Sequence, residues 1–341
     1  MSSERSLDGK TILVTGGAGF IGSHFIRMVL RRHPSARVVN LDKLTYAGNL
    51  DNLHDVQDDP RYEFILGDIR DKALIRRVFA RVQGVVHFAA ETHVDRSIYD
   101  AGEFVLSNVH GTYTLLDALR AFPAVEFFIH VSTDEVYGSR TGRAARETDP
   151  LQPSSPYATT KAAGDHLARA YHHTYGLPTI VLRPSNTFGP CQFPEKLIPL
   201  FLTNALEGKT IPVFGDGLNV RDWLYVEDHC RAVEAAVLKG RNGSVYNVGG
   251  GVELTNIEVV RRILAALDAS RELIQFVPDR PGHDRRYAMD SGLIRALGWE
   301  PETPFAEGLK RTVRWYASNR SWWRKVRMRS LGCVPCTGAI R

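Results

Sequence analysis

The chain of 341 residues lacks several features that would assign it to a specialised class of protein. No apolar run approaches the ~18 residues needed to span a bilayer, so we expect no association with membranes. The stretch MSSERSLDGK carries charge and no apolar core, so we expect no secretory signal and a cytoplasmic location. The chain also has no internal repeat and no low-complexity segment, which excludes solenoids and disordered linkers.

Cysteines are few, and the net charge is small. Of four cysteines, Cys191 and Cys230 are isolated, while Cys333 and Cys336 form a single CVPC. One C-x-x-C without a second pair is weak evidence for zinc, so we expect no bound metal. The net charge of +5 is spread over interspersed acids and bases, so nucleic-acid binding is not implied. The one local bias is the basic stretch 320–329, which we expect to be exposed.

The first half of the chain contains apolar runs that alternate with amphipathic stretches. The apolar runs predict buried strands at 11–16, 36–42, 62–68, 84–90 and 125–132. Helical stretches lie between most of them, for example at 20–32, 71–82 and 104–121. Strands without strict polar alternation, separated by helices, are typical of a parallel sheet covered on both faces. The predicted fold class is therefore α/β, with a doubly wound parallel sheet of the Rossmann type.

The second half is less regular. It predicts strands at 178–183 and 211–214, helices at 226–239, 255–268 and 305–318, and loops at 186–196 and 278–286. We expect a Rossmann-type NAD-binding domain over 1–183 and a tail over 331–341. Between them, 184–330 is expected to form mainly a smaller, discontinuous C-terminal α+β lobe that binds substrate, with some chain returning to the first domain.

A glycine-rich turn directly follows the first predicted strand. In TGGAGFIGS, Gly16, Gly19 and Gly22 form the pattern G-x-x-G-x-x-G and open a helix. Glycine allows the tight turn and the close approach of a pyrophosphate, which the helix N-terminus attracts. Asp42 ends the second strand, and an acid there binds ribose hydroxyls, which favours NAD over NADP. Lys43 leaves a 2′-phosphate, and hence NADP, as an open alternative.

A tyrosine and a lysine lie one turn apart on a predicted helix that begins near Pro156. Tyr157 and Lys161 share one face of this helix. A lysine ammonium and a positive nicotinamide favour the phenolate, so we expect a lowered tyrosine pKa and a base usable at neutral pH. Thr133, at the end of the fifth strand, completes the Tyr, Lys and Ser/Thr set of the extended short-chain dehydrogenase/reductase superfamily, which this arrangement resembles.

Two adjacent acids, Asp134 and Glu135, follow the fifth strand in HVSTDEVYG. An oxidoreductase or a 4-epimerase needs no such pair, whereas β-elimination needs one ionised carboxylate and one protonated carboxyl. Neighbouring acids in a low-dielectric pocket have their pKa values pushed apart, which supplies such a pair. We therefore predict that the strand ends near Thr133 and that a turn brings all three side chains to one substrate. The alternative is a structural role, with Asp134 as a helix N-cap and Glu135 in a surface ion pair.

Several longer stretches resemble one family. HFAAETHVDRS (87–97), VSTDEVYG (131–138), FPEKLIPL (193–200), RDWLYVEDHCRA (221–232) and RPGHDRRYAMD (280–290) are similar to the nucleotide-sugar 4,6-dehydratases, most closely to those that act on dTDP-glucose. DKLTYAGNL (42–50) adds to this resemblance, which covers roughly residues 10–325.

The resemblance implies a reaction on a nucleotide-activated hexose. Tyr157, supported by Lys161 and Thr133, would take the proton of the sugar 4-hydroxyl while hydride passes from C4 to NAD⁺. Glu135 would remove the C5 proton, and Asp134 would protonate the departing 6-hydroxyl. Hydride would then return to C6, leaving a 4-keto-6-deoxy sugar and regenerated NAD⁺.

The resemblance also implies the binding residues. Further contacts to the cofactor are expected from Phe20, Ile21, Thr45, Gly48, Asp68, Ile69, Ala89, Ala90, Ser107 and Thr187. Contacts to the nucleotide sugar are expected from Thr92, Thr133, Asn186, Lys196, Leu197, Pro212, Arg221, Asn256, Arg280 and His283. The physical argument is strongest for Arg221 and Arg280, because a guanidinium fork fits phosphate oxygens. By analogy with the superfamily we expect a homodimer formed through helices at 101–121 and 154–175.

The chain departs from the family pattern in one loop. Where the family has S-N-N-Y-G-P, this sequence has Ser185, Asn186, Thr187 and Phe188. A hydroxyl at Thr187 replaces only part of the hydrogen bonding of an amide. The sequence leaves open dTDP or UDP as the carrier, and the alternatives of a 4-epimerase, a simple oxidoreductase or a non-catalytic binding module.

Overall fold

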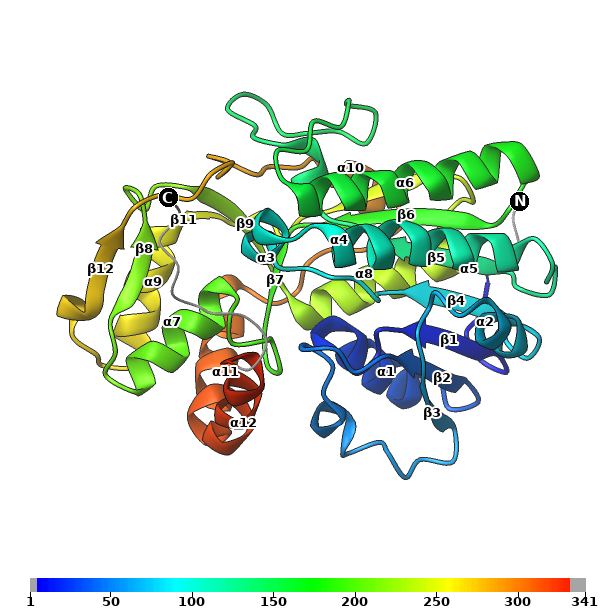
Figure 1. The fold of residues 1–341 in the computed structure, drawn as a ribbon, viewed down its shortest axis with the longest axis horizontal. Helices are drawn as coiled ribbons and strands as arrows, with labels where there is room; N and C mark the ends of the chain where they lie inside the picture. The colour runs from blue at the N-terminus through cyan, green and yellow to red at the C-terminus, as the bar shows by residue number, and fades with distance from the viewer. Residues whose placement is uncertain (1–4, 332–341) are drawn as a thin grey trace.

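The computed structural model describes residues 5–331 (Figure 1). Its centre is a seven-stranded sheet in which every pair of neighbouring strands is parallel, so the predicted fold class is confirmed. The strand order is β10-β6-β5-β4-β1-β2-β3. The strands are β1 (Thr11–Thr15), β2 (Arg37–Asp42), β3 (Tyr62–Leu66), β4 (Gly84–His87), β5 (Phe127–Val131), β6 (Thr179–Pro184) and β10 (Val245–Val248).

Alternate residues of the strands point to opposite sides of this sheet, and they are apolar on both sides. Helices therefore cover both faces. Ile12 and Val14 of β1 belong to one buried cluster, with α1 (Phe20–Arg32) and α8 (Val226–Lys239). Leu13 belongs to a second cluster, with α2 (Lys72–Phe79), α5 (Thr112–Leu119) and α6 (Pro156–Tyr175). Figure 1 shows α5 and α6 along one face, with α1 and α8 on the other.

The segment predicted as one helix over 104–121 is helical but not uniform. It runs through α4 (Gly102–Phe104), a π-helical stretch η2 (Val105–Gly111) and α5. Before it lies the short helix α3 (Val94–Tyr99), which was not predicted. A π-helical stretch inside an α-helix is found most often near functional sites, and Ser107 of η2 lines the cavity described below.

A second lobe holds two small sheets and most of the remaining helices. The sheets are β11 (Glu253–Thr255), β9 (Val220–Tyr225) and β7 (Asn186–Phe188), and β12 (Ile274–Val277) with β8 (Ile211–Phe214). Its helices are α7 (Leu197–Leu206), α9 (Asn256–Ala266), α11 (Phe305–Ser318) and α12 (Arg320–Leu331), whereas α10 (Gly292–Arg295) packs against β10 and α8 of the first domain. Short 3-10 turns are η1 (Leu50–Leu53), η3 (Asp134–Tyr137) and η4 (Arg271–Leu273).

The second half contains several strands and helices that were not predicted, namely β7, β9, β10, β11, β12, α7, α10 and α12. Residues 186–196 were predicted to be a loop, but β7 occupies its first three residues and pairs with β9. Helix α7 was missed because it is apolar on nearly all sides, which removes the helical period. Strand β10 was missed because it has only four residues, yet it adds an edge to the main sheet.

The structure bears on two sequence features, the absence of long apolar runs and the small number of cysteines. Among residues 5–331, no helix has both the length and the hydropathy that a membrane span requires. Cys191 and Cys230 are buried free thiols, whereas Cys333 and Cys336 lie outside the described residues.

Candidate active site

The glycine-rich turn after β1 is shaped by close backbone packing. Gly16 has φ of +71°, and a Cβ there would lie 2.6 Å from the Ala89 nitrogen. A Cβ on Gly22 would lie 2.5 Å from the Gly16 carbonyl oxygen. Helix α1 starts behind this turn with Gly19 as its N-cap and no side chain bonded to its first N–H groups. These groups remain available to an anion, so the turn fits the pyrophosphate of a dinucleotide.

Asp42 and Lys43 stand at the end of β2 beside this turn. Asp42 accepts hydrogen bonds from the backbone N–H groups of Ala18 at 3.0 Å and Leu44 at 2.8 Å. Burial raises the pKa of Asp42, and these two bonds oppose the rise. The Lys43 Nζ lies 2.9 Å from the Asp68 carboxylate, so this cation is already paired. The arrangement suits ribose hydroxyls better than a 2′-phosphate, which favours NAD.

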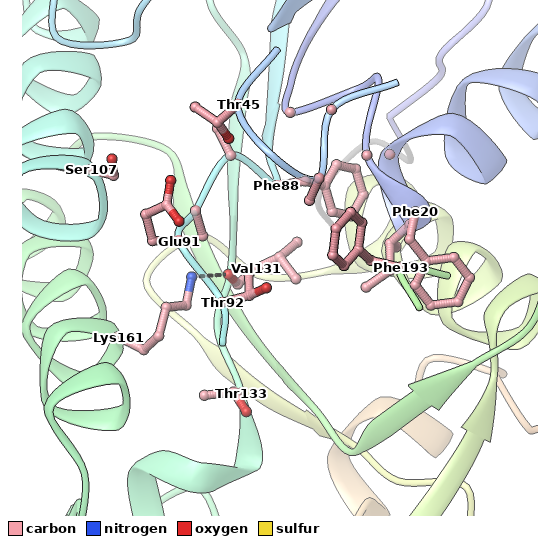
Figure 2. A pocket seen from close by; sticks show the side chains of 18 of the residues that line it. Phe20, Thr45, Phe88, Glu91, Thr92, Ser107, Val131, Thr133, Lys161 and Phe193 are labelled. Atoms are coloured by element: carbon pink, nitrogen blue, oxygen red, sulfur yellow. Dashed lines mark hydrogen bonds between the residues drawn. The ribbon is translucent and has the colours of Figure 1, made fainter. Parts of the chain in front are cut away.

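One cavity contains all the predicted catalytic and cofactor-binding residues. It also contains the predicted substrate residues Thr92, Asn186 and Lys196. In Figure 2, Lys161 and Thr133 lie on one side of this cavity, and Phe20, Phe88 and Phe193 lie across from them. Six predicted substrate residues do not line it, namely Leu197, Pro212, Arg221, Asn256, Arg280 and His283.

The chain turns directly after β5, as predicted. The strand ends at Val131, and Thr133 is the N-cap of the 3-10 turn η3. The Thr133 hydroxyl accepts a hydrogen bond from the Glu135 N–H at 3.3 Å and donates to the Asp134 carboxylate at 3.2 Å. The N-cap is thus Thr133, not Asp134, and the turn brings all three side chains to the cavity wall.

The two acids have different electrostatic surroundings. Burial raises the pKa of Asp134 well above its usual range, and the charges of Glu135 and Asp222 raise it further. Burial also raises the pKa of Glu135, but the cations Lys196, Arg280 and Arg221 oppose this rise. Asp134 is therefore favoured as the protonated carboxyl and Glu135 as the ionised carboxylate.

Helix α6 carries Tyr157 and Lys161, as the sequence predicted. Ser155 caps it by accepting the Ala158 N–H at 3.1 Å, and Pro156 occupies its first turn. The Lys161 Nζ donates to the Val131 carbonyl at 2.7 Å (Figure 2). This bond fixes the ammonium at the end of β5.

The protein's own groups shift the pKa of Tyr157 upward. Burial, and then the charges of Glu135 and Asp134, raise it well above its usual range, while hydrogen bonding with Thr133 opposes the rise. The predicted lowering counted Lys161 and a positive nicotinamide, whereas the protein's own groups, namely burial and the two acids, shift the pKa of Tyr157 upward. Burial lowers the pKa of Lys161 to about 8, and the charge of Asp165 opposes this fall.

Cations surround the acids from the second lobe. The Lys196 Nζ donates to the Thr92 carbonyl at 2.6 Å, and Arg221 stacks over the Tyr287 ring at 4.2 Å. Arg280 pairs with Asp95 at 2.5 Å. Although Arg221 and Arg280 do not line the cavity, their charges act on Glu135.

The other predicted substrate residues lie further along the second lobe. Leu197 and Asn256 are the first residues of α7 and α9. Pro212 lies on β8, and the Nδ1 of His283 is 2.6 Å from the Asp279 carboxylate.

Other cavity residues were not predicted from the sequence. They are Leu41, Ala47, Gly67, Phe88, Glu91, Val131, Ser132, Pro184, Ser185, Gln192 and Phe193. Ser132 and Ser185 follow β5 and β6, and the rule that ligands bind at the carboxyl ends of parallel strands would have found them. Gln192 lies between elements and carries no local signal, whereas Phe193 opens the stretch FPEKLIPL that resembles the family.

Thr187, which departs from the family pattern, makes hydrogen bonds to three residues. The Thr187 hydroxyl donates to the Ser185 carbonyl at 3.2 Å and hydrogen-bonds His229 Nδ1 at 3.0 Å. Gln192 donates to the Thr187 carbonyl at 2.9 Å. Thr187 is therefore held in place by partners on three segments, and it lines the cavity.

Comparison with known proteins gives consistent results. A family model described as GDP-mannose 4,6 dehydratase matches residues 13–312. The dTDP-glucose 4,6-dehydratase of Neisseria meningitidis serogroup B is 52% identical, over 93% of this chain and 96% of that protein. The dTDP-glucose 4,6-dehydratase of Streptomyces venezuelae, solved with NAD bound, is 52% identical with a TM-score of 0.91, over 93% of this chain and 99% of that one.

An epimerase is structurally similar but less so in sequence. The UDP-glucose 4-epimerase of Thermotoga maritima has a TM-score of 0.85 at 32% identity, over 91% of this chain and 99% of that one. The fold alone is thus compatible with either activity. The family model and the relatives at 52% identity decide between them: the chain belongs to the GDP-mannose 4,6-dehydratase family, among relatives that are dTDP-glucose 4,6-dehydratases.

Proposed function

We propose that the protein is an NAD-dependent hydro-lyase that converts dTDP-glucose to dTDP-4-keto-6-deoxyglucose. The observation that carries this proposal is the convergence of Asp134 and Glu135, in unequal surroundings, with Tyr157 and Lys161 in one cavity. The activities of the relatives point the same way.

The oxidation half of the reaction uses Tyr157, Lys161 and Thr133. Bound NAD⁺ would supply the reversible redox chemistry, accepting hydride from C4 of the sugar and returning it at C6. Tyr157 takes the proton from the 4-hydroxyl, and its phenolate needs positive charge nearby because burial and two acids raise its pKa. Lys161, fixed by the Val131 carbonyl, supplies one such charge, and Thr133 hydrogen-bonds the phenol.

The elimination half uses the two acids. A ketone at C4 acidifies the C5–H bond, and Glu135 removes that proton. Asp134, whose pKa burial raises well above its usual range, donates its proton to the departing 6-hydroxyl so that water leaves. Glu135 later returns a proton to C5.

Cations of the second lobe suit the diphosphate. Lys196 lies in the cavity wall and donates to the Thr92 carbonyl, and the charges of Arg221 and Arg280 act on Glu135. We propose that these three cations hold the phosphates and that Asn186 contacts the sugar or the phosphate next to it. The Asn186 Oδ1 is buried without a hydrogen-bond partner among the described residues, which favours a ligand there.

We also propose that the protein is a homodimer formed through the helical segment 101–121 and α6. Both carry exposed apolar side chains, Val105 and Leu106 on η2 and Tyr175 at the end of α6. Burying such side chains against a second copy would stabilise the pair. Light scattering of the purified protein tests this, and a monomer mass at micromolar concentration would contradict it.

The proposed reaction is tested by incubating the protein with dTDP-glucose, and separately with UDP-glucose, in D₂O. We expect the product to have lost one water and to carry deuterium at C5, as measured by mass spectrometry and NMR. The substrate that reacts faster identifies the carrier. A C4 epimer without loss of water would refute the dehydratase assignment and support the epimerase alternative.

A further inference from the structure

The C-terminal helix α12 contacts both halves of the molecule. Arg324 and Arg327 lie 3.5 Å and 3.2 Å from the Glu207 carboxylate, at the end of α7. On the side of the first domain, the Trp322 Nε1 donates to the Asn52 Oδ1 at 3.0 Å. Lys325 pairs with Asp51 at 2.7 Å. A basic stretch expected only to be exposed thus ties α12 to two separate parts of the chain.

Asn52 connects α12 to the glycine-rich turn. Its side chain is 3% exposed, and its Nδ2 donates to the Ala18 carbonyl at 3.0 Å. The same carbonyl accepts the Asn49 N–H at 3.0 Å, and the Ala18 N–H is bound by Asp42 at 3.0 Å. Ala18 lies between Gly17 and Gly19 in the glycine-rich turn. These bonds therefore hold both the backbone N–H and the backbone carbonyl of Ala18.

Trp322 is itself held by a packed corner of α11 and α12. Its ring meets the ring of Trp315 edge-on at 4.8 Å. The neighbouring Trp323 is fully buried, and its Nε1 donates to the Tyr316 carbonyl at 2.9 Å. Tyr316 in turn donates to the carbonyl of Gln192, which lines the cavity. The indole of Trp322 is therefore positioned by packed neighbours in α11 and α12.

We propose that Trp322 is a positioning residue that holds the glycine-rich turn through Asn52 and so slows the release of NAD. The inference rests on the proposed function, in which the cofactor is neither consumed nor exchanged during turnover. Slow release then costs the enzyme no activity. Losing the indole N–H leaves the Asn52 side chain free to turn, which loosens the Ala18 carbonyl and the N-terminus of α1 that would face the pyrophosphate.

The test compares Trp322→Phe with a matched control, Trp315→Phe. The first variant keeps an aromatic ring but loses the bond to Asn52, whereas the second alters the same aromatic corner without touching Asn52. NAD release is measured by chasing labelled NAD from the loaded protein, and thermal melting is recorded in parallel. One neutral hydrogen bond corresponds to roughly a 2- to 12-fold effect, so we expect Trp322→Phe to release NAD about fivefold faster.

A second variant tests the route through Asn52. Asn52→Ala removes the acceptor for Trp322 and a donor to Ala18, so we expect release at least as fast as in Trp322→Phe. The double variant is expected to release NAD no faster than Asn52→Ala alone, because both changes break one chain of contacts.

The possible results separate the two proposals. If the wild type holds NAD and Trp322→Phe holds it equally long, the positioning role is wrong and the proposed function is untouched. If both tryptophan variants release NAD equally fast, a general loosening of the corner explains the effect and the inference is also wrong. If the wild type takes up no NAD at all, the proposed function fails and the inference fails with it.

Discussion

Replacing Glu135 with glutamine is the most direct test of the chemistry. The amide keeps the size and hydrogen-bonding capacity of the side chain but cannot accept the C5 proton. Of the other acids that line the cavity, burial raises the pKa of Asp134 well above its usual range and also raises the pKa of Glu91, while Asp42 and Asp68 are engaged by backbone N–H groups or by Lys43. Asp134 is thus a poor substitute base, and Asp42 and Asp68 are occupied elsewhere.

The expected magnitude follows from the loss of a positioned base. Such a loss slows a reaction by about 10² to 10⁴, or about 2.7 to 5.4 kcal/mol in the barrier. We expect a slowing within this range for Glu135→Gln. Burial raises the pKa of Glu135, so its charged form is disfavoured in the folded protein and the neutral amide should not lower the melting temperature.

The assay follows deuterium at C5 and the loss of water from dTDP-glucose in D₂O. Glu147→Gln is the matched control: burial also raises the pKa of Glu147, which accepts the Asn247 N–H at 2.9 Å and does not line the cavity. The control should exchange C5 at close to the wild-type rate. If Glu135→Gln still incorporates deuterium at that rate, Glu135 is not the base and the assignment of the two acids is wrong.

Three further predictions concern the cofactor turn, the core and the lysine. Gly16→Ala should weaken NAD binding at least tenfold in calorimetric titrations, because its Cβ would meet the Ala89 nitrogen at 2.6 Å and its φ is +71°; unchanged affinity would contradict the close packing. Asp165→Asn should lower the free energy of unfolding by about 3–5 kcal/mol in urea titrations, because it leaves the buried Arg183 guanidinium, now 2.7 Å from the carboxylate, unpaired. Burial lowers the pKa of Lys161 to about 8, so its ammonium is present below that pH and lost above it, and kcat should fall as the pH rises through 8. Lys161→Arg should move this fall to higher pH. If the pH profile does not move, the fall in kcat belongs to another group.

The sequence alone determined the parts of the protein that depend on short stretches of chain. The glycine spacing, the acid at the end of β2 and the pair Tyr157 and Lys161 each involve residues within one turn or one strand–helix unit. The carboxyl ends of parallel strands meet at one edge of a sheet, so local motifs at those ends predicted a common site. This is why every predicted catalytic and cofactor-binding residue lines the same cavity.

Only the tertiary structure decided the contacts between distant segments and the electrostatics that follow from them. The opposite direction of the Tyr157 pKa depends on burial and on the acids of another element, which spacing on α6 does not reveal. The pairing of Arg280 with Asp95 joins residues 185 positions apart, and the bond from Trp322 to Asn52 spans 270. Such contacts are absent from any local pattern, because they form only when the packing of the whole chain brings the two segments together.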